Sequence, residues 1–132
     1  MTAASPETGR RELPGDPDVA TVLSTVAREV RDARAVLAGG DPARAASEAS
    51  SRLQHAEDLI HRLSASPRHD RDTWILAVAL RDELSGYLLA ASTLGETGVA
   101  PTVVLDVLQR GADQAEEVLA RLTAVAGRAP GL

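Results

Sequence analysis

The stretch DTWILAVALRDEL, Asp72 to Leu84, contains seven consecutive apolar residues, Trp74 to Leu80. On a helix such a run points in every direction, whereas a helix at the surface of a small domain normally shows one apolar face. The core face follows from spacing, because Ala77, Leu80 and Leu84 recur at steps of three and four residues. Apolar residues are left over on the flanks of the same helix: Trp74, Ile75, Val78 and Leu89.

The same three-and-four spacing runs through most of the chain and predicts helices at 17–38, 42–65, 71–94 and 101–126. Asp16 before Pro17 and Asp41 before Pro42 are typical helix starts, with a capping carboxylate followed by proline at the first helical position. Similar helix lengths and short linkers predict an all-α, antiparallel up-down-up-down four-helix bundle.

The bundle is expected to occupy residues 16–127 as one domain. Residues 1–15 are polar, rich in proline and glycine and without periodicity, which predicts a disordered N-terminal tail. Residues 128–132 follow Gly127 and contain Pro130, so a flexible C-terminus is expected.

Composition limits the function. The net charge is −5, which argues against nucleic-acid binding because such proteins normally carry a concentrated basic surface. All 14 basic residues are arginine, and lysine, asparagine and phenylalanine are missing, a composition typical of a GC-rich genome. The chain has no cysteine, so thiolate metal sites and disulfides are excluded. No window reaches the ~18 apolar residues that cross a bilayer, so no membrane contact and a cytoplasmic location are expected.

The antiparallel arrangement also predicts contacts inside the bundle. Leu84 is expected to be fully buried at mid-height. Tyr87 is expected opposite the small residues Ala46, Ala49 and Ser50, and Gly111 with Ala115 is expected to form a notch opposite Leu80 and Leu84. The small residues near Ala49 and Gly111 are compatible with plain large-to-small packing or with a cavity for a ligand.

Two of the three histidines lie in LQHAEDLIHRL on the second predicted helix. Carboxylates and imidazoles at helical spacing can hold a metal. The core residues Ala56, Ile60 and Leu63, however, place His55, Glu57, Asp58 and His61 on the outer or flanking surface, which favours a solvated charged face without metal or cofactor. The mixed charges Arg28, Glu29, Arg31, Asp32 and Arg34, and Asp113, Glu116, Glu117 and Arg121, are likewise interpreted as solvated faces.

Arg62 and His69 in RLSASPRH match the R-x(4–6)-H spacing of HEPN ribonuclease domains, which are also helical and usually dimeric, so the chain resembles such a domain. That resemblance implies a nuclease that uses Arg62 and His69. In the family both residues lie near the start of a late helix, whereas Pro67 here separates them across a helix end and a loop.

No G-x-S-x-G, P-loop or G-x-G-x-x-G motif is present, and no catalytic residue is assigned from such a motif. We therefore expect a small non-enzymatic helical module that binds another protein, or itself as a homodimer, through Trp74, Ile75, Val78 and Leu89. Tryptophan is favoured in interface cores, and this chain has one. The alternatives are the HEPN-like nuclease, a secretion or assembly chaperone, and a wide core face that needs no partner.

Overall fold

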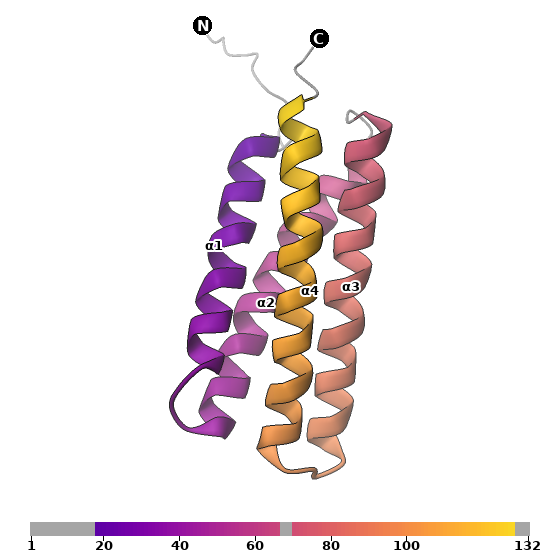
Figure 1. Ribbon diagram of the computed structural model, residues 1–132. Helices are drawn as coiled ribbons and strands as arrows, with labels where there is room; N and C mark the ends of the chain where they lie inside the picture. Colours follow the sequence, from indigo (N-terminus) through magenta and orange to yellow (C-terminus); the bar gives the residue numbers. More distant parts are fainter. Residues whose placement is uncertain (1–17, 67–69, 129–132) are drawn as a thin grey trace, which may run out of the picture.

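A computed structural model of the chain describes residues 18–66 and 70–128. These residues form four α-helices, α1 (Val19–Leu37), α2 (Pro42–Ala65), α3 (Arg71–Glu96) and α4 (Pro101–Arg128). Successive helices run in opposite directions and lie side by side (Figure 1). The predicted all-α four-helix bundle is therefore confirmed. The tail predicted for residues 1–15 lies outside the described residues, as does nearly all of the predicted flexible C-terminus.

The start of α2 follows the predicted capping. Asp41 accepts a hydrogen bond from the backbone N–H of Arg44 (3.1 Å), and Pro42 occupies the first turn. Asp70 caps α3 in the same way. A capping carboxylate satisfies backbone N–H groups that have no partner within the first turn of a helix. The two downstream helices extend slightly past their predicted ends, to Glu96 and Arg128.

The start of α1 differs from the prediction. The capping residue is Asp18, whose carboxylate accepts from the backbone N–H of Thr21 (3.1 Å) and also from its hydroxyl. Asp16, the predicted cap, lies outside the described residues. Asp18 has threonine three residues later and thus gains a second donor, whereas Asp16 would meet Val19 at that position. The prediction went wrong because it relied on proline and ignored that donor.

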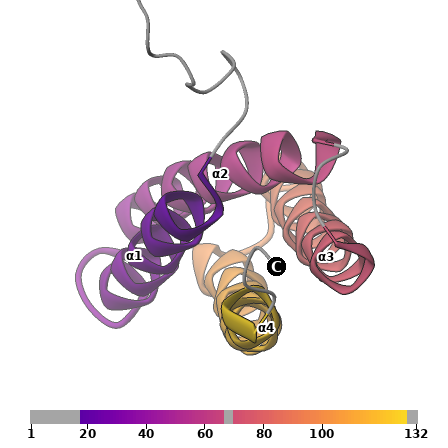
Figure 2. The same ribbon diagram turned by 90° about the horizontal axis from the view of Figure 1, so that it is seen from above.

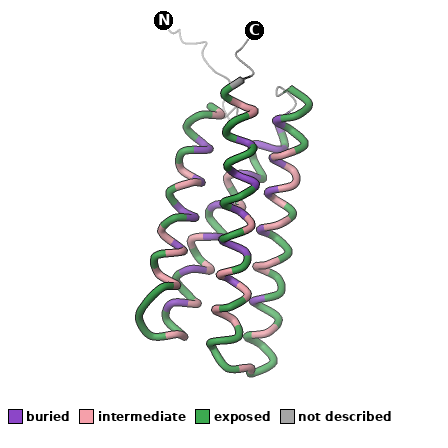
Figure 3. The backbone as a smooth tube through the Cα atoms, in the orientation of Figure 1, coloured by how far each residue is buried: buried purple, intermediate pink, exposed green. Residues whose placement is uncertain are grey.

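Seen from above, α2 runs at an incline alongside α1 and across toward α3, and α4 lies on the opposite side of the bundle (Figure 2). Each helix packs against the next along the chain, α1 packs against α4, and α2 also contacts α4 across the diagonal. The inward sides carry the core, and the outward sides are exposed (Figure 3). The largest fully buried side chains are Leu53, Ile60, Leu63, Leu80, Leu84, Leu108, Leu122, Val26 and Val30.

Tyr87 packs against α4 at Gly111. A Cβ atom built on Gly111 would lie 2.7 Å from Cβ and 2.9 Å from Cγ of Tyr87, closer than two carbons can approach. The expected notch at Gly111 therefore exists, but Tyr87 occupies it. The expectation that Tyr87 faces Ala46, Ala49 and Ser50 on α2 was wrong. Its periodicity placed it on the core side without showing which neighbouring helix it meets.

We expect Leu84→Ala to lower the free energy of unfolding by about 2–5 kcal/mol, because Leu84 is 1% exposed and its removal leaves a cavity in the core. Chemical denaturation followed by circular dichroism measures this change. A loss below about 1 kcal/mol would mean that the site collapses around the alanine.

A pair of glycine substitutions tests the contact between α3 and α4. Gly111→Ala should destabilise the protein by about 1–3 kcal/mol through overpacking against Tyr87, despite the better helix propensity of alanine. Gly86, within α3, has open space around its Cα, so Gly86→Ala should stabilise by up to about 1 kcal/mol. Thermal and urea unfolding measure the stability of both variants. A gain in stability for both of them would contradict the close contact between Tyr87 and Gly111.

Candidate interaction surface on helix α3

The exposed large apolar side chains gather on α3. In the described chain four such residues are exposed, and three of them are on this helix: Trp74 (45%), Ile75 (44%) and Leu89 (69%). The fourth is Val103 (43%) at the start of α4. Val78, also assigned to the surface from the sequence, is half-buried. Trp74, Ile75, Val78 and Leu89 are called the α3 outer face below.

The structure brings three of these residues together and sets the fourth apart. Trp74 and Ile75 lie in the first turn of α3, and Val78 lies one turn later. Leu89 is 15 residues from Trp74, or about 22 Å along the helix at 1.5 Å per residue. The polar residues between them include the ion pair Arg81–Asp82 (3.2 Å). The α3 outer face thus consists of an upper apolar patch and a lower leucine on either side of a charged midpoint.

Trp74 is held against α2 by a hydrogen bond. Its indole Nε1–H donates to the backbone carbonyl of Ser64 (2.9 Å), in the last turn of that helix. Carbonyls in the last turn have no partner within their own helix, so the indole satisfies one of them. Arg81 donates to the hydroxyl of the same serine (3.4 Å). Trp74 therefore takes part in joining α2 to α3 while about half of its surface stays exposed.

Asp70 sets the position where α3 begins. Its carboxylate accepts from the backbone N–H groups of Asp72 (3.2 Å) and Thr73 (3.3 Å) and from the Thr73 hydroxyl. The Thr73 hydroxyl is the main cause of a lowered pKa of Asp70, and the backbone N–H groups contribute. The cap consequently stays ionised to a lower pH than an aspartate without these hydrogen bonds, and Trp74 follows it four residues later.

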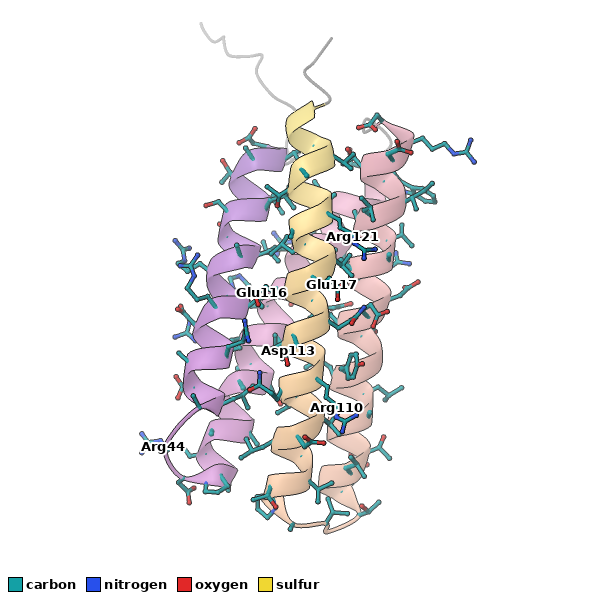
Figure 4. All side chains as sticks on the ribbon, in the orientation of Figure 1. Arg44, Arg110, Asp113, Glu116, Glu117 and Arg121 are labelled. Carbon is teal, nitrogen blue, oxygen red and sulfur yellow. The ribbon has the colours of Figure 1, made fainter. Side chains whose placement is uncertain are left out.

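The outward side of α4 has the opposite character. Figure 4 shows charged side chains along this helix, all exposed: Arg110, Asp113, Glu116, Glu117 and Arg121. The pair Glu117–Arg121 (3.2 Å) lies one helical turn apart, as its spacing predicts. Arg34 of α1 bridges to Asp113 (3.0 Å) and to Glu116 of α4. This side is the solvated charged face expected from the sequence, and burying it against an apolar partner would carry a desolvation cost.

A polar cluster between α1 and α2 was missed by the sequence analysis. Glu29, interpreted as a solvated residue, is 9% exposed. His55 Nδ1 contacts one of its carboxylate oxygens at 3.0 Å, and Arg52 donates to the other at 3.3 Å. Glu29 lies three residues after Val26 and four before Ala33, both in the core, so helical spacing could have placed it at the edge of the core.

The pKa of Glu29 reflects two opposing influences. Burial, the larger single influence, raises it, but the hydrogen bonds and charges of His55 and Arg52 together lower the pKa below the ordinary 4.5. A charged carboxylate can be buried here because both of its oxygens have a partner on α2. The cluster therefore contributes to the packing of α1 against α2.

The histidines and carboxylates considered for a metal form no metal-binding cluster among the described residues. Within 18–66 and 70–128, no three His, Asp or Glu side chains lie close enough together to hold a metal. Arg62 is exposed near the end of α2, while His69 falls outside the described part of the chain. Near the buried Ala49, α2 and α3 border an open groove whose lining includes Ser50, Gln54, Leu88 and Ser92.

Glu29 predicts the acid sensitivity of the fold. A carboxylate whose folded-state pKa is lowered adds stability above its unfolded pKa, and this contribution is lost as pH falls from about 4.5 through the folded-state value. Glu29→Gln should therefore cost about 1.5–3 kcal/mol near pH 7, the range for hydrogen bonds to a charged group. Urea unfolding between pH 7 and pH 3 should show a smaller loss for this variant than for the wild type. If the free energy of unfolding falls equally with pH in the two chains, Glu29 does not contribute to the acid sensitivity.

No protein-family model matches the sequence, and neither the curated proteins nor the solved structures give a match. None of the four helices contains a stretch both long and apolar enough to cross a membrane within the described residues. Three of the four exposed large apolar side chains in the described residues belong to the α3 outer face.

Proposed function

We propose that this chain is a protein-interaction module that binds a protein partner, or itself, through the α3 outer face. The observation that carries the proposal is the exposure of Trp74, Ile75 and Leu89 on a helix whose opposite side forms the core. Scattered single apolar residues are normal on protein surfaces, but their concentration on one helix is typical of an interaction site.

A partner bound to the α3 outer face would cover exposed apolar side chains, and this burial favours binding. Fully burying a large apolar side chain gives about 1.5–3 kcal/mol relative to leaving it exposed. Trp74 and Ile75 are each a little less than half exposed and Leu89 is 69% exposed, so covering each of them gives only part of that free energy. Their combined burial supports binding that is modest unless further contacts form around them.

Trp74 is well suited to act as an anchor. Its hydrogen bond to Ser64 fixes the indole before any partner arrives. A side chain that is already ordered loses less rotational freedom on binding than a mobile one. Tryptophan is also among the residues most often found at the energetic centre of interfaces. The hydrogen bond has a second consequence, because a substitution of Trp74 would disturb the bundle as well as the surface.

Leu89 therefore gives the cleaner test of this proposal. Leu89→Asp should weaken self-association, or capture of a partner from the organism's own lysate, by at least about tenfold, because a carboxylate would have to be desolvated. Val103→Asp on α4 is the matched control, since Val103 is also an exposed apolar residue but lies off the α3 outer face. Light scattering, pull-down and circular dichroism measure association and helix content.

The expected result is loss of association for Leu89→Asp, no loss for Val103→Asp and unchanged helix content in both. Equal binding by Leu89→Asp and the wild type would contradict the proposal. Equal loss in both variants would mean that the binding surface is not centred on α3.

A further inference from the structure

A stripe of residues on α3 runs nearly parallel to the helix axis. With about 100° of rotation per residue, Trp74, Val78, Ser85, Leu89 and Ser92 fall within about 60° of one another. All of them are exposed except Val78, which is half-buried. These five residues are called the α3 stripe; it extends over about 27 Å at 1.5 Å per residue.

The α3 stripe has one positive and one negative edge at its midpoint. By the same rotation, Arg81 lies about 20° outside one edge and Asp82 about 20° outside the other. Within the chain, Nη2 and Nε of Arg81 contact the same oxygen of Asp82, Oδ1, at 3.2 and 3.4 Å. The Asp82 side chain is 68% exposed, so its second oxygen can accept from another guanidinium.

We propose that the α3 stripe pairs with the α3 stripe of a second copy of this chain, with the two helices parallel. This inference rests on the proposed function and names the partner. A two-fold axis parallel to the helices exchanges the two edges of the seam. Arg81 then faces Asp82 of the partner subunit, and Asp82 faces Arg81 of the partner subunit. Two opposite-charge pairs form at the midpoint, one on each side of the seam.

The same charges disfavour an antiparallel pair. In that arrangement the two-fold axis is perpendicular to both helices and keeps each residue on its own side of the seam. Pairing centred between Arg81 and Asp82 would set Arg81 beside Arg81 of the partner subunit, and like charges at an interface cost several kcal/mol. Moving the centre to Ser85 would set Arg81 about 10 Å along the axis from Asp82 of the partner subunit, so no opposite-charge pair forms there either.

Residues at heptad spacing also run along the edge of the α3 stripe that carries Arg81, a pattern that parallel and antiparallel helix pairs share. Trp74, Val78, Arg81, Ser85, Leu88 and Ser92 follow one another at alternating steps of four and three. This is the heptad spacing with which two helices keep one seam in contact. Leu88 is half-buried and lines the groove between α2 and α3.

Cysteine cross-linking tests the geometry directly, because the chain contains no cysteine of its own. Ser85 and Ser92 are both exposed and lie two turns apart, about 10 Å along the helix. In a parallel pair each faces its own copy, so Ser85→Cys and Ser92→Cys should each give a disulfide-linked dimer under mild oxidation. Ser47→Cys, at an exposed position on α2, is the matched control and should cross-link far less.

An antiparallel pair can set only one of these two positions against itself, because they lie too far apart. Cross-linking of Ser85→Cys or Ser92→Cys alone, or of neither above the control, would therefore overturn the parallel seam. The wild-type chain should show a mass of two 13.8 kDa chains by light scattering at the concentration used.

Charge reversal across two chains provides the second test. Arg81→Asp and Asp82→Arg should each weaken self-association by at least about tenfold, because each places like charges on both sides of the seam. An equimolar mixture should recover it as a heterodimer, since Asp at 81 then faces Arg at 82 of the other chain. Neither variant regains its own intrachain pair in the mixture, so the recovery reports contacts between chains. A mixture no more associated than the single variants would contradict the proposal.

This design separates the inference from the proposed function. If the wild-type chain is monomeric while Leu89→Asp still abolishes capture of another protein, the α3 outer face is an interaction surface but the second copy is not its partner. If Leu89→Asp changes neither self-association nor capture, both proposals fail together.

Discussion

The rotation of α3 about its own axis is the constraint on which the rest of the surface depends. On one side Tyr87 packs directly against Gly111 of α4, where a residue with a Cβ atom would not fit. On the other side the Trp74 indole is tied to the Ser64 carbonyl of α2. Between them Leu84 is buried in the core. A helix fixed at both flanks cannot turn its surplus apolar residues inward, so they remain on the surface.

The bundle itself could be read from local signals. Asp41 followed by Pro42 marks the start of α2, and the core leucines of α3 recur at the spacing of a buried face. These signals lie within a few residues of one another along the chain. Leu84 was therefore placed correctly in the core, and three of the four surface residues of α3 were placed correctly in solvent.

Apart from the cap of α1, the misassignments involve pairs of residues on different helices. Tyr87 was expected to meet α2 and meets α4, because periodicity gives the side of a helix but not its neighbour. Glu29 was assigned to the solvent because its partners, Arg52 and His55, lie on the next helix and its own helix does not reveal them. A carboxylate at the edge of a core is stable when such partners exist, and their register cannot be known before the helices are packed.

The hydrogen-bonded indole has a practical consequence for observing the molecule. Trp74 is the chain's single tryptophan, so all tryptophan fluorescence comes from one position, at the contact of α2 with α3 and at one end of the α3 stripe. Separation of the two helices would release the indole to water, whereas coverage of α3 by another surface would remove water from it. The emission would shift in opposite directions in the two cases. The wavelength of tryptophan emission thus distinguishes unfolding from association without any added label.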